Sequence, residues 1–186
     1  GLLHEFIKRP NSDLTSQADK TKNNTYIFQS LHQKSTFELK TSITCDFSIS
    51  SSNYVQIFVL ANDTIENPFG YVLKTDPDHK TLSLFYLDSL FKYHLIIPGP
   101  ENILNKTTKN SFYVDLLTYS NGNWRLQIDT SMVPDQTWTG YGYYKKPNIG
   151  FCGIKFNDTS TRSDKLIIHD FIVTSPMCDI HSVIQK

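Results

Sequence analysis

The feature that most constrains this 186-residue chain is a long period-two alternation of side-chain character over residues 37–49. The even positions are all polar, and the odd positions are Phe37, Leu39, Thr41, Ile43, Cys45, Phe47 and Ile49. Successive side chains of a β-strand point to opposite faces, so the pattern predicts a long strand with one buried and one wet face. Residues 54–60 are apolar at nearly every position, which predicts a central strand packed on both sides.

Further strands are expected between turn signals that recur along the whole chain. They are predicted at 70–74, 81–87, 112–118, 124–129, 149–156 and 165–174, with a shorter candidate at 26–29. The pair Asn121-Gly122 favours a tight hairpin between two of these strands. Residues 88–97 fit either a strand or a helical turn, and residues 134–147 are expected to form an aromatic-rich loop.

Composition supports an all-β fold, because strong helix formers are scarce. Alanine occurs only at Ala18 and Ala61, and glutamate occurs only four times. The length suits a single domain over 1–186, with an irregular N-terminal arm at 1–25, an edge segment around 2–7 within it, and a C-terminal tail at 176–186.

Charge and hydropathy narrow the range of partners. Eighteen basic residues balance eighteen acidic ones, so no excess of positive charge is available to neutralise nucleic-acid phosphates. No apolar stretch approaches the roughly 18 residues that span a bilayer, so we expect no membrane span within this chain.

Four Asn-x-Thr sequons indicate a secreted or lumenal protein. Their acceptors are Asn23, Asn62, Asn105 and Asn157, each in a predicted loop or strand edge where a glycan is tolerated. A chain this rich in Asn, Ser and Thr also produces sequons by chance.

The cysteine count leaves the redox compartment open. Cys45, Cys152 and Cys178 are an odd set, so at most one disulfide forms. We predict that Cys152 pairs with Cys178 and pins the tail after the last strand. The alternative is three reduced, buried cysteines. No Cys/His spacing suits a structural zinc site.

The C-terminal half resembles the sandwiches of the concanavalin family. The hairpin at 112–129, the Ile149-Gly150-Phe151 strand and the closing strand at 166–175 follow an order similar to that of L-type lectins, and 54–62 resembles their central apolar strand. The resemblance covers roughly residues 35–175. It implies a concanavalin A-like jelly-roll sandwich of two antiparallel sheets that binds a glycan or glycoprotein in the endoplasmic reticulum lumen or outside the cell.

The chain departs from that family at its metal and sugar positions. L-type lectins carry an aspartate where Asn53 begins the central strand, and an amide is a weaker partner for sugar hydroxyls than a carboxylate. In L-type lectins an acidic pair on the next strand holds calcium. The matching positions in this chain lie near residues 71–74, which contain no acid. Asp63, Asp76 and Asp78 offer oxygen ligands, but acids beside a proline turn commonly form the turn itself. We therefore expect no metal and no cofactor.

Catalysis is not expected. Glycosidases of this fold need two carboxyl groups at a defined separation, and none of the four glutamates shares a predicted strand with another. His169 and Asp170 are adjacent on a predicted strand and should point to opposite faces, so they cannot form a relay. No nucleophile or phosphate-binding motif is present.

The predicted ligand contacts are Asn53, Tyr141, Tyr143 and Arg162. The tyrosines lie in a Trp-Thr-Gly-Tyr-Gly-Tyr segment whose rings can stack on sugar and whose glycines would allow a ligand to approach closely. In the alternative for this segment, Trp138 and one or two tyrosines cover the core. Our first hypothesis is a non-catalytic lectin-like domain. The second is a sugar-inactive module for protein–protein contact or structure, and a weaker third is an atypical hydrolase.

Overall fold

A computed structural model describes residues 14–15, 24–30, 37–62, 68–104, 109–119, 121–130, 137–145, 151–157 and 166–174. The strands in these ranges are β1 (Leu14–Thr15), β2 (Asn24–Ser30), β3 (Phe37–Cys45), β4 (Tyr54–Ala61), β5 (Gly70–Asp76), β6 (Thr81–Leu87), β7 (Tyr93–Ile97), β8 (Asn110–Thr118), β9 (Asn123–Thr130), β10 (Trp138–Tyr143), β11 (Phe151–Asn157) and β12 (Leu166–Thr174). None of the described residues belongs to a helix long and apolar enough to cross a bilayer.

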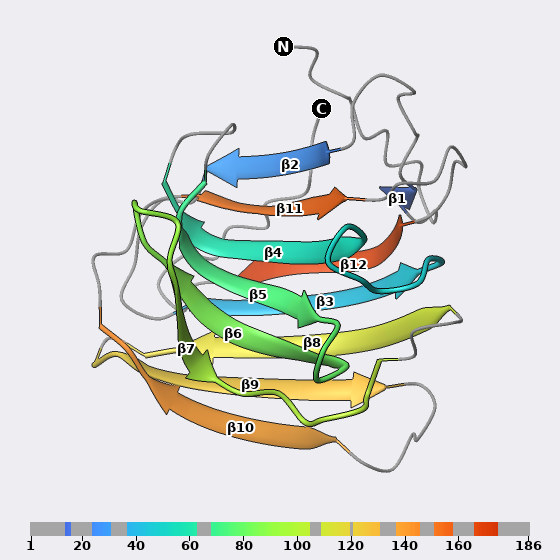
Figure 1. The fold of residues 1–186 in the computed structure, drawn as a ribbon. Coiled ribbons are helices and arrows are strands. Elements are labelled where there is room, and N and C mark those ends of the chain that lie inside the picture. The colour runs from blue at the N-terminus through green and yellow to red at the C-terminus, as the bar shows by residue number, and fades with distance from the viewer. Residues whose placement is uncertain are drawn as a thin grey trace.

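The described strands form two antiparallel sheets that face each other as layers (Figure 1). Sheet A has the order β1-β12-β3-β8-β9-β10, and sheet B has the order β2-β11-β4-β5-β6-β7. Strands adjacent in sequence pair as hairpins in β4-β5-β6-β7 and in β8-β9-β10. The last two strands pair with early ones instead: β11 lies between β2 and β4, and β12 lies between β1 and β3. The predicted all-β jelly-roll sandwich is confirmed.

The alternation at residues 37–49 becomes β3 and the segment that follows it. The burial of β3 alternates from Phe37 to Ile43, and Leu39 and Ile43 are fully enclosed between the sheets. The strand ends at Cys45, four residues before the predicted end, yet Phe47 and Ile49 remain buried. Burial of the alternating residues thus continues beyond the hydrogen-bonded ladder.

The central apolar segment forms β4, which is packed on both sides as predicted. Val55, Ile57 and Val59 join the core between the sheets. The register of β4 against β5 shifts between Val59 and Ala61. On the face that points away from sheet A, Phe58 and Ala61 form a smaller buried cluster with residues of β5 and β6. Sheet B therefore carries apolar material on its outer face as well as its inner one.

The aromatic-rich loop predicted over 134–147 is wrong for its central part, which is the edge strand β10 paired with β9. Glycine is usually depleted in strands, which hides β10 in the sequence. Here the glycines face β7. A Cβ at Gly142 would lie 2.6 Å from the Ile96 carbonyl oxygen, and one at Gly140 would lie 2.7 Å from Ile97 Cγ2. Because the two glycines have no side chains, the edge strands β10 and β7 of the two sheets can approach each other closely.

Three other expectations change in the structure. Residues 88–97 divide into a turn and the strand β7. The N-terminal arm contributes β1, which pairs with β12, while the expected edge segment at 2–7 lies outside the described residues. The register shifts between Ile168 and Asp170, so His169 and Asp170 are both exposed instead of facing opposite sides.

The predicted disulfide is not formed at Cys152, which is a buried free thiol on β11. Its expected partner Cys178 lies outside the described residues. Burial raises the pKa of the Cys152 thiol to about 12, and burial also raises the pKa of Cys45. Both thiols therefore stay protonated and behave as small apolar side chains.

Candidate functional site

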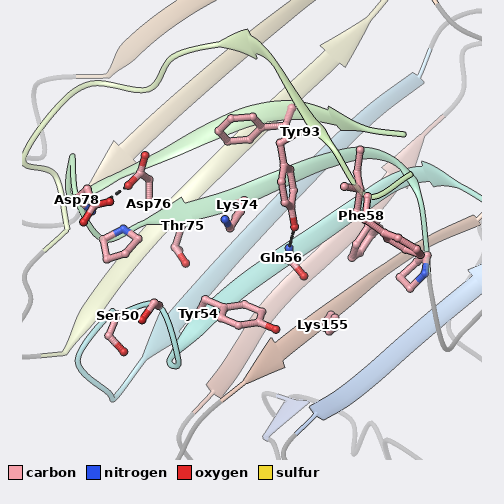
Figure 2. A pocket seen from close by; sticks show the side chains of 16 residues that line it. Ser50, Tyr54, Gln56, Phe58, Lys74, Thr75, Asp76, Asp78, Tyr93 and Lys155 are labelled. Atoms are coloured by element: carbon pink, nitrogen blue, oxygen red, sulfur yellow. Dashed lines mark hydrogen bonds between the residues drawn. The ribbon is translucent and has the colours of Figure 1, made fainter. Parts of the chain in front are cut away.

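A hollow of about 580 Å³ lies on the outer face of sheet B, and we call it the hollow (Figure 2). Its lining comes from β4, β5, β6, β7 and β11, from the turn at 50–51 and from the turn at 76–78. This volume is in the range of small-molecule sites in proteins. The hollow sits directly over the outer cluster that contains Phe58 and Leu87.

The register of sheet B sorts the floor of the hollow into a polar and an apolar row. Gln56 on β4 lies opposite Lys155 of β11 on one side and Lys74 of β5 on the other. Two residues further along β4, Phe58 lies opposite Val72, which in turn lies opposite Phe85. A ligand in the hollow therefore meets charges and an amide beside aromatic rings.

Tyr93 lies across this floor from the edge strand β7, as Figure 2 shows. Gln56 Nε2 donates a hydrogen bond to the Tyr93 hydroxyl oxygen at 2.6 Å. Lys74 Nζ lies 4.6 Å from the centroid of the Tyr93 ring, and the Phe85 ring meets that ring edge-on at 5.6 Å between centroids. Three side chains thus hold the tyrosine in one orientation.

The hydrogen bond leaves the Tyr93 hydroxyl with its own proton to donate, because the Gln56 amide uses an oxygen lone pair. Burial raises the pKa of Tyr93, although the hydrogen bond from Gln56 opposes this shift. The phenol is therefore neutral at physiological pH and serves as a donor toward the hollow.

One rim of the hollow is the tight turn between β6 and β7. Phe91 there adopts a left-handed backbone with φ of 60° and is 52% exposed. The Asp88 carboxylate supports the turn, since its Oδ1 accepts from the backbone N–H of Leu90 and of Lys92 at 2.9 Å each. The His94 hydrogen bond lowers the pKa of Asp88, and those backbone donors add to the effect. An exposed aromatic residue held in a costly conformation is typical of a functional position.

The other rim is the Asp76-Pro77-Asp78-His79 turn. Asp76 Oδ2 pairs with His79 Nδ1 at 2.9 Å, and its Oδ1 accepts from the Asp78 backbone N–H at 2.9 Å. Burial opposes ionisation of Asp76, but these hydrogen bonds outweigh it and lower the pKa. Its bond to Asp76 raises the pKa of His79. Both groups are therefore engaged within the turn.

The described residues contain no group of three or more His, Cys, Asp or Glu side chains suited to hold a metal ion. Asp76 and Asp78 line the hollow, but the oxygens of Asp76 serve the turn that they form. What the arrangement offers is a shaped surface with aromatic faces, an amide, a phenol and two amines.

The contacts predicted from the sequence do not come together at one place. Asn53 ends the turn before β4, where its N–H donates to Ser50 Oγ at 3.0 Å, next to Tyr54 in the lining of the hollow. Tyr141 and Tyr143 lie on β10 at the edge of the other sheet and are 74% and 65% exposed. Arg162 lies outside the described residues.

The alternative for the aromatic segment holds for part of it. Trp138 and Tyr144 are partly buried and pack against the core, as do the even positions of β10 generally. Tyr141 alternates with them and lies opposite Arg125 of β9, on the outer face of sheet A. The tyrosine pair and the hollow are therefore on opposite faces of the sandwich.

The main residues of the hollow that sequence reasoning missed are Gln56, Lys74, Tyr93 and Lys155. One signal was available: Gln56 is the sole amide inside an otherwise apolar strand segment, and a buried amide needs a hydrogen-bond partner. The other three are unremarkable in sequence, because only the pairing of β11, β4 and β5 and the path of β7 bring them together.

The structure argues against one of the predicted glycosylation sites. The Asn62 side chain is 5% exposed, and its Oδ1 accepts from the Phe69 backbone N–H at 2.7 Å. A glycan needs an accessible amide, so Asn62 is a poor acceptor in the folded chain. Asn23 and Asn105 lie outside the described residues, and Asn157 is the last residue of β11.

No protein-family profile and no curated protein sequence matches the chain. Solved structures do resemble it. The exoplasmic/lumenal domain of VIP36, in a Ca²⁺/Man-bound form, has a TM-score of 0.56 and 11% identity, covering 94% of this chain and 82% of that one.

Two further structures have comparable scores. The carbohydrate-binding module CBM66 from Bacillus subtilis has a TM-score of 0.53 and 12% identity, covering 88% of this chain and 92% of that one. The carbohydrate recognition domain of Emp47p has a TM-score of 0.51 and 11% identity, covering 90% of each chain. At these identities the likeness shows the fold, which is a lectin-like β-sandwich.

Proposed function

We propose that this chain is a non-catalytic lectin-like domain that binds a glycan in the hollow on sheet B. One observation carries the proposal: aromatic rings and hydrogen-bonding groups converge at Tyr93, which lies over the floor and is held by Gln56 at 2.6 Å. Sugars offer C–H faces for rings and hydroxyls for hydrogen bonds, so the hollow matches both parts of their surface.

The binding mechanism follows from how the groups are held. The exposed ring of Phe91 at the rim stacks on one face of a sugar, while the Tyr93 hydroxyl donates to a sugar hydroxyl. Because Gln56, Lys74 and Phe85 already fix Tyr93, little side-chain freedom is lost on binding. The Asp88 carboxylate holds the backbone on either side of Phe91, which keeps this residue at the rim.

Sequence and fold support a role without catalysis. The hollow contains no glutamate in its lining, and its carboxylates are the two aspartates of the 76–78 turn. Despite its burial, Asp76 has a pKa that is lowered by hydrogen bonds within the turn, so this group is a poor general acid toward a glycosidic oxygen. We also propose that binding needs no metal, in contrast to the Ca²⁺/Man-bound VIP36 domain.

We propose a location in the lumen of the secretory pathway or outside the cell, with a glycoprotein as the natural partner. The sequons support this location, as does the likeness to a domain described as exoplasmic/lumenal. Mass analysis of the native protein tests it, because unoccupied sequons at Asn23, Asn105 and Asn157 would contradict it.

A glycan array tests binding directly, with and without EDTA. We expect binding in both conditions, and loss of most of it in Phe91→Ala and in Tyr93→Phe. The matched control is the double variant Tyr141→Ala/Tyr143→Ala, which removes exposed rings from the other face. If that control loses binding while the hollow variants retain it, the site is on sheet A. Absence of binding to any glycan supports a sugar-inactive module instead.

A further inference from the structure

The hollow is long compared with a single sugar, and its length follows the strands beneath it. Asp76 of its lining lies opposite Thr81, which begins β6, and Leu87 of its lining ends the same strand. Thr81 and Leu87 are six residues apart in sequence, which corresponds to roughly 20 Å at the rise of a β-strand. The hollow therefore extends along the strands well beyond the width of one sugar ring.

Tyr93 divides this length into two halves, because its hydroxyl oxygen meets Gln56 in the middle of the floor at 2.6 Å. One half lies between Tyr93 and the rim that carries Phe91, where the proposed sugar stacks. The other half lies between Tyr93 and the turn that contains Asp78. Figure 2 shows Tyr93 and Gln56 between Phe58 toward one end and Asp78 at the other. A single sugar stacked on Phe91 leaves this second half unused.

The second half has an aromatic residue of its own, Tyr54. It begins β4 and lies two residues before Gln56, so both side chains are on the outer face of the strand and both line the hollow. The Tyr54 side chain is partly exposed. Its ring therefore offers a second flat surface on which the C–H face of a sugar can stack.

Polar groups from two turns surround Tyr54. Ser50 Oγ accepts from the backbone N–H of Asn53 at 3.0 Å and from that of Ser52 at 3.3 Å, which leaves the Ser50 hydroxyl its own proton to donate. Asp78 is exposed on the opposite turn, and its carboxylate can accept from sugar hydroxyls in charge-assisted hydrogen bonds. The second half thus repeats the combination of a ring with hydrogen-bonding groups.

We infer that the hollow binds two consecutive sugars of an oligosaccharide. The first lies against Phe91 and Tyr93, and the second stacks on Tyr54 between Ser50 and Asp78. This inference rests on the proposed glycan binding and adds the class of ligand, which is a chain of linked sugars and not a single one. The Tyr93 hydroxyl lies where the two sugars join and can donate to either of them.

The test is an NMR titration of the protein with free mono-, di- and trisaccharides of glucose, mannose and galactose. For the sugar type that binds, we expect the disaccharide to bind about tenfold more tightly than the monosaccharide, because a second ring is then stacked. A third unit should add less than about twofold, since the turns at 50–51 and 76–78 bound that end of the hollow.

Three variants locate the second sugar. Tyr54→Ala should abolish the gain from the second unit and change the monosaccharide affinity by less than about twofold. Asp78→Ala changes an exposed residue, so the fold is kept, and it should lower the disaccharide affinity about threefold. Tyr141→Ala is the matched control, because it removes an exposed tyrosine from the other sheet and should keep the full gain.

The outcomes separate this inference from the proposed function. Equal affinities for mono- and disaccharides overturn the inference and leave glycan binding standing, whereas no binding at any length overturns the proposed function. A gain that survives in both Tyr54→Ala and Asp78→Ala places the second sugar elsewhere and overturns the inference. A further tenfold gain with the third unit contradicts a site for two sugars.

Discussion

Replacing Gly142 by alanine tests whether the two sheets are held together through β10 and β7. The new Cβ would lie 2.6 Å from the Ile96 carbonyl oxygen and 2.7 Å from Ile97 Cγ1. Carbon pairs prefer about 3.5–4.0 Å, so the strands must separate by close to 1 Å or strain locally. The obstacle includes backbone, which cannot move aside by rotating a side chain.

The magnitude follows from two opposing effects. Overpacking of a well-packed site costs about 1–3 kcal/mol, and the backbone contact at Ile96 puts Gly142→Ala at the upper end. Alanine also has less conformational entropy than glycine in the unfolded chain, which stabilises the folded protein by about 0.4–1 kcal/mol. The expected net loss is about 2 kcal/mol in the free energy of unfolding, or a fall of roughly 4–8 °C in Tm for a chain of this size.

Urea unfolding followed by tryptophan fluorescence and circular dichroism measures this loss, and coincident transitions establish two-state behaviour. Gly140→Ala is the matched variant. Its Cβ meets the Trp138 ring at 2.2 Å and Ile97 Cγ2 at 2.7 Å, which are side-chain atoms that can shift, so we expect about 1 kcal/mol. Tyr141→Ala, on the exposed face, should change stability by less than about 0.5 kcal/mol. A Gly142→Ala protein as stable as the wild type would refute the proposed role of these glycines.

Three further predictions concern the outer cluster, the 76–78 turn and the cysteines. Phe58→Ala should lower the free energy of unfolding by about 3 kcal/mol in urea unfolding, because Phe58 is 1% exposed, and an unchanged midpoint contradicts packing on both faces of β4. An NMR titration should give His79 a pKa above about 6.5 that falls in Asp76→Asn. Because the pKa of His79 is raised, its contribution to folding stability is present below pH 6.5 and is lost as pH rises through the pKa of His79 in the folded protein. Because the pKa of Asp76 is lowered, its contribution is lost as pH falls through the pKa of Asp76 in the folded protein. Cys45 and Cys152 should resist alkylation until the protein is unfolded in denaturant, and rapid labelling of either at pH 8 contradicts their burial.

How far the sequence leads differs between elements of the same sandwich. For β3, the alternation of side chains predicts which face is buried, because the period of a strand and the burial of apolar groups act locally. For β10, the same reasoning fails. Gly140 and Gly142 suggest a loop when only the sequence is considered. Glycine is needed there because β7, more than forty residues earlier in the chain, packs against these two positions.

The candidate site shows the same limit. Gln56 is detectable as an amide in an apolar strand, but its partner Tyr93 lies 37 residues away and on a strand that the sequence left ambiguous. The exposed tyrosines predicted as contacts are exposed, yet they lie on the opposite face from the hollow. A sequence shows which residue types are suited to binding, and the sheet order decides which of them share a surface.

By itself, the sequence determined that this chain is all β, that β4 is packed on both sides, and that the glutamates of a glycosidase pair are missing, because those properties depend on composition and on a period of two residues. The tertiary structure alone decided that Lys155, Gln56 and Lys74 form one row and that Tyr93 lies across it. It also decided that glycines are needed where β10 packs closely against β7. The physical reason is that strand pairing joins segments distant in sequence, and their register is set by the packing of the whole sandwich.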